Sequence, residues 1–198
     1  MKLPKKLKNR YLIIRHGESK ANMAEIILSH PEEGIKEDYT LTAEGDNQVR
    51  KSIEGTKREG LLDKETIIYS SPFSRCKRTA EITKEVLGTK NEIIFDDRLR
   101  ERWFGTLEKQ HNSNYQAVWD IDKENPKHKE FEVESAQEVQ ERILSLVNDL
   151  ENQYSDEKIL LVSHGDVLQI LQTGFLNQSP GSHREIPHLK TAEIKELK

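Results

Sequence analysis

Two histidines, His16 and His164, each stand just beyond a short apolar run in the sequence. His16 follows Arg15 and the run 11–14, and His164 follows the run 158–162. Such runs are typical of strands that are buried on both faces. An imidazole with an ordinary pKa of about 6.5 is neutral near pH 7 and still basic enough to attack phosphorus. The two positions therefore suggest phosphoryl chemistry at the ends of two strands.

Phosphoryl transfer through an enzyme nucleophile needs more than a histidine. The transferring group spreads negative charge over its oxygens, so cations and hydrogen-bond donors must surround it. Arg15 and Arg75 suit this need because a guanidinium donates in pairs to phosphate oxygens and keeps its charge. Glu101 can protonate the leaving alkoxide and then activate water. The sequence thus offers an attacking histidine, a phosphate-binding cage and one acid/base carboxylate.

The elements that must position these residues form an alternating pattern. Strands are predicted at 11–14, 66–69, 92–95 and 158–162, with helical patterns between them. Strands that alternate with helices predict an α/β fold, a three-layer α/β/α sandwich with a mostly parallel sheet. The tail at 189–197 leaves open one antiparallel edge strand. Ligand sites of such sheets lie beyond the carboxyl ends of the strands, so we expect one cluster there, formed by Arg15, His16, Arg75, Glu101 and His164.

Helix boundaries are marked by residues with known preferences for helix ends. Helix starts are expected at Thr42, at Pro72 and at the capping box of Ser135 and Glu138. A helical pattern extends over 26–28, a loop is expected at 30–39, and residues 105–134 show no regular pattern.

Composition favours a folded protein with a strongly hydrated surface. The 198 residues suit a single domain over 1–198, and the net charge of -4 argues against nucleic acid as a partner. A basic N-terminal arm at 1–10 is expected to be a solvated tail. No apolar stretch is long enough for a transmembrane helix, so no membrane association is expected. The single cysteine, Cys76, cannot form an internal disulfide, which predicts a cytoplasmic setting.

Five motifs in the chain resemble those of the histidine phosphatase superfamily, also called the phosphoglycerate-mutase-like family. They occur in the expected order over positions 11 to about 176, and this ordered set is far more specific than any one tetrapeptide. The motifs are Arg15-His16-Gly17-Glu18-Ser19 with Asn22, Leu41-Thr42 with Gly45 and Gln48, Ser70-Ser71-Pro72-Phe73-Ser74-Arg75 with Thr79-Ala80, Leu99-Arg100-Glu101-Arg102-Trp103-Phe104-Gly105, and Ser163-His164-Gly165-Asp166.

The resemblance implies a role for each matching residue. His16 would be the phosphorylated nucleophile and Glu101 the acid and later the base. The phosphoryl group would be held by Arg15, Asn22, Arg75 and His164, with His164 protonated by its dianionic neighbour. The family uses no metal, the sequence shows no metal-ligand motif, and no cofactor is expected.

The resemblance also implies a reaction and two alternatives. The prediction is a phosphomonoesterase acting on a small-molecule phosphate ester, since the family's mutases carry a longer insertion between Glu101 and His164. The alternatives are a 2,3-bisphosphoglycerate-dependent phosphoglycerate mutase and a non-catalytic module that binds a phosphorylated ligand. Lys109 departs from a glycine common in the family, which bears on the local loop shape. The physiological substrate and the oligomeric state do not follow from the sequence.

Several other residues have simpler interpretations. Glu18 and Asp166 are expected to support or cap their neighbours, and Cys76 to be a small buried apolar side chain. Trp103 and Phe104 are suited equally to the substrate cleft and to the core. The remaining histidines lack ligand-like spacing and are expected at the surface, namely His30, His111, His128, His183 and His188.

Overall fold

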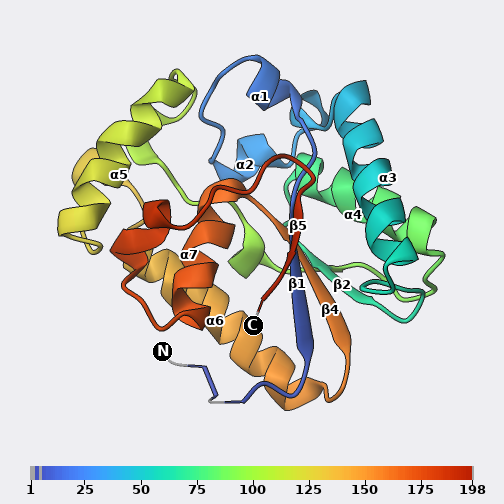
Figure 1. The fold of residues 1–198 in the computed structure, drawn as a ribbon. Helices are drawn as coiled ribbons and strands as arrows, with labels where there is room; N and C mark the ends of the chain where they lie inside the picture. Colours follow the sequence, from blue (N-terminus) through green and yellow to red (C-terminus); the bar gives the residue numbers. More distant parts are fainter. Residues whose placement is uncertain (1–2, 5, 198) are drawn as a thin grey trace.

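The computed structural model describes residues 3–4 and 6–197, built around one five-stranded sheet (Figure 1). The strand order is β3-β2-β4-β1-β5. Strands β1 to β4 pair in parallel, whereas β5 pairs antiparallel with β1 at the edge of the sheet. The strands are β1 (Arg10–Arg15), β2 (Ile67–Ser70), β3 (Ile94–Phe95), β4 (Lys158–Ser163) and β5 (Ile194–Glu196). The mostly parallel sheet and its antiparallel edge strand are therefore confirmed.

Helices cover both faces of this sheet, as Figure 1 shows. Helices α3 (Ala43–Arg58) and α4 (Ser74–Leu87) pack on one face, and α6 (Ala136–Gln153) and α7 (Gly165–Phe175) pack on the other. Three further helices lie beyond the strand ends, namely α1 (Lys20–Met23), α2 (Pro31–Gly34) and α5 (Tyr115–Glu124). Among the described residues, no helix is long and apolar enough to cross a membrane.

The two cores follow from the alternation of side chains along the central strands. In β1, Tyr11 and Ile13 join the cluster under α6 and α7, whereas Leu12 and Ile14 join the cluster under α3 and α4. All four side chains are buried, which explains why the sequence of this strand contains a continuous apolar run. The three-layer α/β/α sandwich is thereby confirmed.

Two of the three predicted helix starts are formed by the residues that predicted them, whereas α4 begins at Ser74, two residues after the expected Pro72. The Thr42 hydroxyl accepts a hydrogen bond from the Gly45 amide at 2.9 Å and starts α3. Ser135 and Glu138 form the expected reciprocal capping box of α6. Gly88 ends α4 with a φ of 73°, in the left-handed region that favours glycine.

Three stretches differ from the expectations. The helical pattern at 26–28 is wrong, because α1 ends early and the Ile27 amide donates to the Gln110 carbonyl at 2.8 Å in an extended pairing. The expected loop at 30–39 contains α2 and a 3-10 turn at Glu37–Tyr39. Residues 105–134 contain α5, whose Val118 packs into a third small core. The pairing of Ile27 with Gln110 is a long-range contact, which a local pattern does not encode.

The basic N-terminal arm is not simply a solvated tail. The Lys8 amide donates to the Glu151 carboxylate at 2.6 Å, and the Asn9 side chain donates to the same carboxylate at 2.9 Å. These contacts tie the chain before β1 to the end of α6. The basic residues Lys2 and Lys5 lie outside the described residues.

Strand register brings the candidate residues to one edge of the sheet. Arg15 pairs with Ser163, and Ser70 pairs with Val162, so three parallel strands end nearly level. His16, Ser71 and His164 therefore leave the sheet side by side.

We predict that Gly105→Ala destabilises the protein by at least about 2 kcal/mol. Residue 105 has a left-handed backbone conformation, and the added methyl group would overlap atoms that already fill the space beside it. Gly105 has a φ of 56°, and an added Cβ would lie 1.8 Å from the Phe131 carbonyl oxygen. The matched control is Gly55→Ala, where an added Cβ meets nothing within 4 Å inside α3. Urea unfolding should show that the control gains roughly 0.5–1 kcal/mol. Equal stability of the two variants would contradict this account.

Candidate active site

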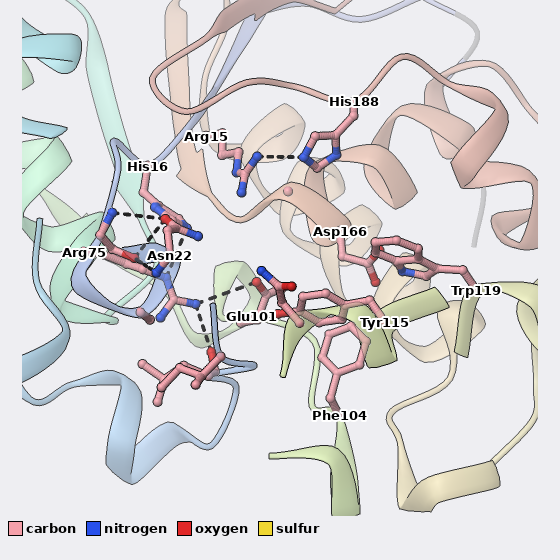
Figure 2. Close-up of a pocket in the computed structure, with 16 residues that line it drawn as sticks. Arg15, His16, Asn22, Arg75, Glu101, Phe104, Tyr115, Trp119, Asp166 and His188 are labelled. Carbon is pink, nitrogen blue, oxygen red and sulfur yellow. Dashed lines mark hydrogen bonds and ion pairs between the residues drawn. The ribbon is translucent and has the colours of Figure 1, made fainter. Parts of the chain in front are cut away.

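A cleft of about 300 Å³ opens at the carboxyl edge of the sheet (Figure 2). It is lined by five of the six site residues that the sequence predicts, Arg15, His16, Asn22, Arg75 and Glu101. Helices α4 and α7 both begin beside it, so the positive ends of two helix dipoles face the same region. The arrangement brings distant parts of the chain together around one small volume.

His16 is held as a neutral imidazole with a defined orientation. Its Nδ1 lies 2.8 Å from the Gly17 carbonyl oxygen, and its Nε2 lies 3.1 Å from Nε of Arg75. These partners assign the proton to Nδ1 and a lone pair to Nε2. Burial, followed by the charges of Arg75 and Arg15, holds the pKa of His16 well below its ordinary value. At neutral pH Nε2 therefore keeps its lone pair, which accepts the hydrogen bond of Arg75 in this structure and which can attack once that bond is given up.

Arg75 is buried with part of its hydrogen-bonding capacity unused. Its Nη2 donates to the Leu28 carbonyl at 3.1 Å and lies 3.7 Å from Oε2 of Glu101. Its Nη1 is buried and has no hydrogen-bond partner. A buried donor without a partner is costly in a folded protein, so this group is suited to an acceptor supplied by a ligand.

Arg15 is fixed by a histidine that the sequence did not single out. Its Nη1 donates to the Leu189 carbonyl at 2.9 Å and lies 2.7 Å from Nε2 of His188. Nδ1 of His188 lies 3.1 Å from Oε1 of Gln169, which assigns the His188 proton to Nδ1 and leaves Nε2 as the acceptor. Burial, Arg15 and Arg184 lower the pKa of His188 to about 4, so the ring is neutral at pH 7. The Nε of Arg15, also buried, has no hydrogen-bond partner.

Glu101 has the environment of a carboxylic acid that titrates near neutrality. It is 7% exposed, and its Oε1 accepts a hydrogen bond from the Arg102 amide at 2.9 Å. Burial raises its pKa to about 7, with Arg75 opposing the shift and Asp166 adding to it. Such a group can donate a proton and take one back at physiological pH.

His164 lies beside the other residues but does not line the cleft. It is fully buried, with Nε2 2.9 Å from the Ser71 hydroxyl and Nδ1 3.6 Å from Oε2 of Glu101. Burial, then Arg75 and His16, hold its pKa well below the ordinary value and favour the neutral ring. The protonated form expected from the resemblance would need the opposing charge of a phosphoryl group. Contact with that group would need a local movement of the ring or of Glu101.

Asn22 directs its amide nitrogen away from its own helix cap. Its Oδ1 accepts hydrogen bonds from the Ser19 amide at 3.0 Å and from the Ser19 hydroxyl at 2.9 Å. Because the oxygen is occupied in this capping box, the Nδ2 protons are the part of the side chain that remains to donate into the cleft.

A buried charge network supports the backbone next to Glu101. The Arg102 side chain is fully buried and donates to both carboxylate oxygens of Asp122 at 2.6 and 2.8 Å, and to Asp166 at 3.2 Å. Trp119 donates from Nε1 to Asp166 at 2.9 Å. Although burial opposes ionisation, His183 and Arg102 hold the pKa of Asp166 below its ordinary value. The network joins α5 and α7 to the segment that carries Glu101.

Two histidines in this network were wrongly expected at the surface. His128 and His183 are 6% and 0% exposed. Nε2 of His128 lies 3.0 Å from Asp122, and Nε2 of His183 lies 3.2 Å from Asp166. The partner of His183 is 17 residues away in the chain and that of His128 only six, so it is the burial of the acidic partners themselves that the spacing did not indicate.

The remaining expectations have mixed outcomes. Cys76 is a buried small side chain, as expected, and burial raises the pKa of its thiol to about 12. Phe104 serves both as core and as cleft wall, whereas Trp103 lines a separate hollow beside His30. Glu18 supports a neighbouring helix cap, accepting from the Thr42 hydroxyl at 2.7 Å.

Lys109 stands where the resemblance leads us to expect a glycine, and its backbone conformation is one that favours glycine. Its φ is 62°, in the left-handed region that side chains rarely adopt. Its Nζ lies 3.0 Å from Oε2 of Glu33, so an ion pair accompanies the unusual conformation. Within the described ranges 3–4 and 6–197, no group of three or more histidine, cysteine or acidic side chains could hold a metal ion.

Comparison with known proteins places this arrangement in a family. The model of the histidine phosphatase superfamily (branch 1) matches residues 11–198. The Escherichia coli protein named probable phosphoglycerate mutase GpmB is 32% identical over 184 residues, which cover 88% of this chain and 78% of that protein. The chain therefore belongs to the histidine phosphatase superfamily, as the motifs indicated, and is an enzyme of the histidine phosphatase type.

Solved structures of similar fold include two phosphatases. A mycobacterial glucosyl-3-phosphoglycerate phosphatase, solved as a complex with VO3, superposes with a TM-score of 0.79 at 21% identity, covering 96% of this chain and 92% of that chain. The phosphoserine phosphatase of Entamoeba histolytica, solved in complex with 3-phosphoglyceric acid, gives a TM-score of 0.74 at 25% identity, covering 95% and 89%. These structures confirm the fold.

The raised pKa of Glu101 predicts a specific dependence of stability on pH. A carboxyl whose pKa rises from an ordinary 4.5 to about 7 on folding binds its proton more tightly in the folded state. The carboxyl of Glu101 therefore adds to the free energy of unfolding at low pH, and this contribution is lost as the pH rises through 7. Between pH 5 and 8, the wild type should lose about 2 kcal/mol more stability than Glu101→Gln.

Urea unfolding at the two pH values measures this difference. The control is Glu54→Gln, which removes an exposed carboxylate on α3 and should follow the wild type. If Glu101→Gln and the wild type lost stability in parallel, Glu101 would not titrate near neutrality.

Proposed function

We propose that this chain is a metal-independent phosphomonoesterase that hydrolyses a small phosphorylated metabolite through a phosphohistidine at His16. The observation that carries the proposal is the pairing of a neutral His16, whose Nε2 lone pair faces Arg75, with a Glu101 whose pKa lies at about 7. A nucleophile that is neutral at pH 7 and a carboxyl that can hold a proton at that pH thus border one cleft.

In the first half-reaction, Nε2 of His16 attacks phosphorus and the bond to the ester oxygen breaks. The buried donors of Arg15 and Arg75 that have no protein partner stabilise the charge on the transferring oxygens. The amide of Asn22 is a further donor. Glu101, protonated, gives its proton to the departing alkoxide, so the alcohol leaves uncharged.

In the second half-reaction, a water molecule attacks the phosphorus of the phosphohistidine. The Glu101 carboxylate formed in the first step accepts a proton from that water. The bond between phosphorus and Nε2 breaks, its electron pair returns to His16, and inorganic phosphate leaves. Glu101 is then protonated again. Nδ1 of His164 lies 3.6 Å from Oε2 of Glu101.

The relatives give the proposal its context. The structural relatives are named as phosphatases, whereas the Escherichia coli relative is named as a mutase. A mutase would need 3-phosphoglycerate and added 2,3-bisphosphoglycerate and would release little free phosphate. Phosphate release from simple monoesters without a bisphosphate therefore separates the two reactions, and a non-catalytic binding module would show neither.

We predict that His16→Ala lowers kcat/KM by at least about 10⁴-fold on any hydrolysed monoester, because no other group supplies the nucleophile. The matched control is His111→Ala, which removes an exposed histidine that does not line the cleft. Release of phosphate from a panel of sugar and metabolite phosphates measures the effect. Unchanged activity in His16→Ala, or no activity of the wild type on the whole panel, would refute the proposal.

Glu101→Gln should lower kcat by roughly 10²- to 10⁴-fold on alkyl phosphates, whose alkoxide needs a proton to leave. The rate of the first half-reaction should fall less with 4-nitrophenyl phosphate, because nitrophenolate leaves without protonation. Burst and steady-state kinetics of the two substrates measure this contrast. An equal loss in the burst rate for both would contradict a role of Glu101 as the acid.

A further inference from the structure

The cleft has two halves of different chemistry. The reacting half holds Arg15, His16, Asn22, Arg75 and Glu101, which bind and transfer the phosphoryl group in the proposed function. The other half, here called the outer half, is the part that would face the alcohol of the ester. It is formed by Ile26, Phe104, Asn112, Tyr115, Trp119 and Asp166.

The aromatic rings of Phe104, Tyr115 and Trp119 lie together in the wall of the outer half, as Figure 2 shows. Tyr115 and Trp119 stack with ring centroids 5.3 Å apart and an angle of 13° between the rings. Phe104 meets Tyr115 edge to face at 4.6 Å. These contacts fix the wall before any ligand arrives, so an apolar group that packs on it incurs little ordering cost.

Two further contacts, with Asp166 and with Arg184, hold the Trp119 side chain in place. Its Nε1 donates to Asp166 at 2.9 Å, and the guanidinium of Arg184 lies 3.7 Å from its ring centroid. Arg184 also donates to Gln169. This cation is therefore engaged with Trp119 and Gln169, and it does not line the cleft.

Among the described residues that line it, the outer half offers no free cation to a ligand. Asp166 is its one ionisable acid, and Arg102 and Trp119 already bond to its carboxylate. Within the part of the chain that the structure describes, no lysine lines the cleft, and its only arginines are the two beside His16. His188 also lines the cleft, but its Nε2 serves as an acceptor for Arg15. A second anionic group on a ligand would thus meet a carboxylate and no free cation.

From this division we infer that the ester cleaved at His16, in the function proposed above, is the monophosphate of an uncharged alcohol with an apolar or ring-shaped body. Esters that carry a carboxylate or a second phosphate on the alcohol are selected against. Selectivity arises from packing on Tyr115 and Trp119 and from the lack, among the described lining residues, of a free cation that could pair with a second anionic group.

Three phosphonates test this inference by binding alone, since their carbon–phosphorus bond resists hydrolysis. Ethylphosphonate is the reference, benzylphosphonate adds a ring, and 2-carboxyethylphosphonate adds only a carboxylate. We expect benzylphosphonate to bind the wild type about tenfold more tightly than ethylphosphonate. We expect 2-carboxyethylphosphonate to bind about tenfold more weakly. Calorimetric titration gives the three Kd values.

Variants of Trp119 test the wall directly. Trp119→Leu should reduce the preference for benzylphosphonate over ethylphosphonate about fivefold, and Trp119→Phe should retain most of it. The control is Trp103→Leu, in the separate hollow, which should keep the full preference. If 2-carboxyethylphosphonate bound as well as ethylphosphonate, or the benzyl group gave no gain, the inference would be overturned.

Hydrolysis separates this inference from the proposed function. Benzyl phosphate should have a higher kcat/KM than ethyl phosphate, and glycerol 3-phosphate a higher one than 3-phosphoglycerate. The predicted order of phosphonate binding without hydrolysis of any ester would refute the phosphatase and leave the selectivity of the cleft in place. Hydrolysis of all four esters in the opposite order would refute the selectivity and leave the phosphatase in place.

Discussion

Buried positive charge next to a neutral imidazole is the constraint on which the site depends. Arg15 and Arg75 each place a buried guanidinium nitrogen without a protein partner beside His16. Such an arrangement costs stability, because two cations and two unused donor nitrogens are withdrawn from water. In the function proposed above, a tetrahedral phosphoryl anion offsets that cost by accepting hydrogen bonds from these two side chains.

The surrounding structure serves to hold these cations in place. His188 and the Leu189 carbonyl fix Arg15, and the Leu28 carbonyl fixes Arg75. Burial, and then the same positive charge, lowers the pKa of His16 and favours its neutral form, while burial raises the pKa of Glu101 to about 7. Opposite pKa shifts in one small volume thus give a base that can attack and an acid that can donate.

Local signals allowed most of the fold and part of the site to be predicted from the sequence. Apolar runs marked the central strands, and their carboxyl ends located His16 and His164. In the outer half, the sequence made Phe104 a candidate for the cleft, but Tyr115, Trp119 and His188 could not be predicted in this way. Tyr115 and Trp119 lie in a stretch without clear periodicity, and Trp119 is positioned by Asp166, which is 47 residues away in the chain. His188 reaches Arg15 only because the segment before β5 folds back along β1.

The central claim is that His16 becomes covalently phosphorylated. Its most direct test uses Glu101→Gln and 4-nitrophenyl phosphate, since a good leaving group permits the first step and the missing base delays the second. After mixing and an alkaline quench, which preserves phosphohistidine, peptide mapping locates the phosphoryl group. The account predicts close to one phosphoryl group per chain, on His16 and absent from a variant that also carries His16→Ala. Release of nitrophenolate with no phosphorylated His16, or with the label on another residue, would contradict it.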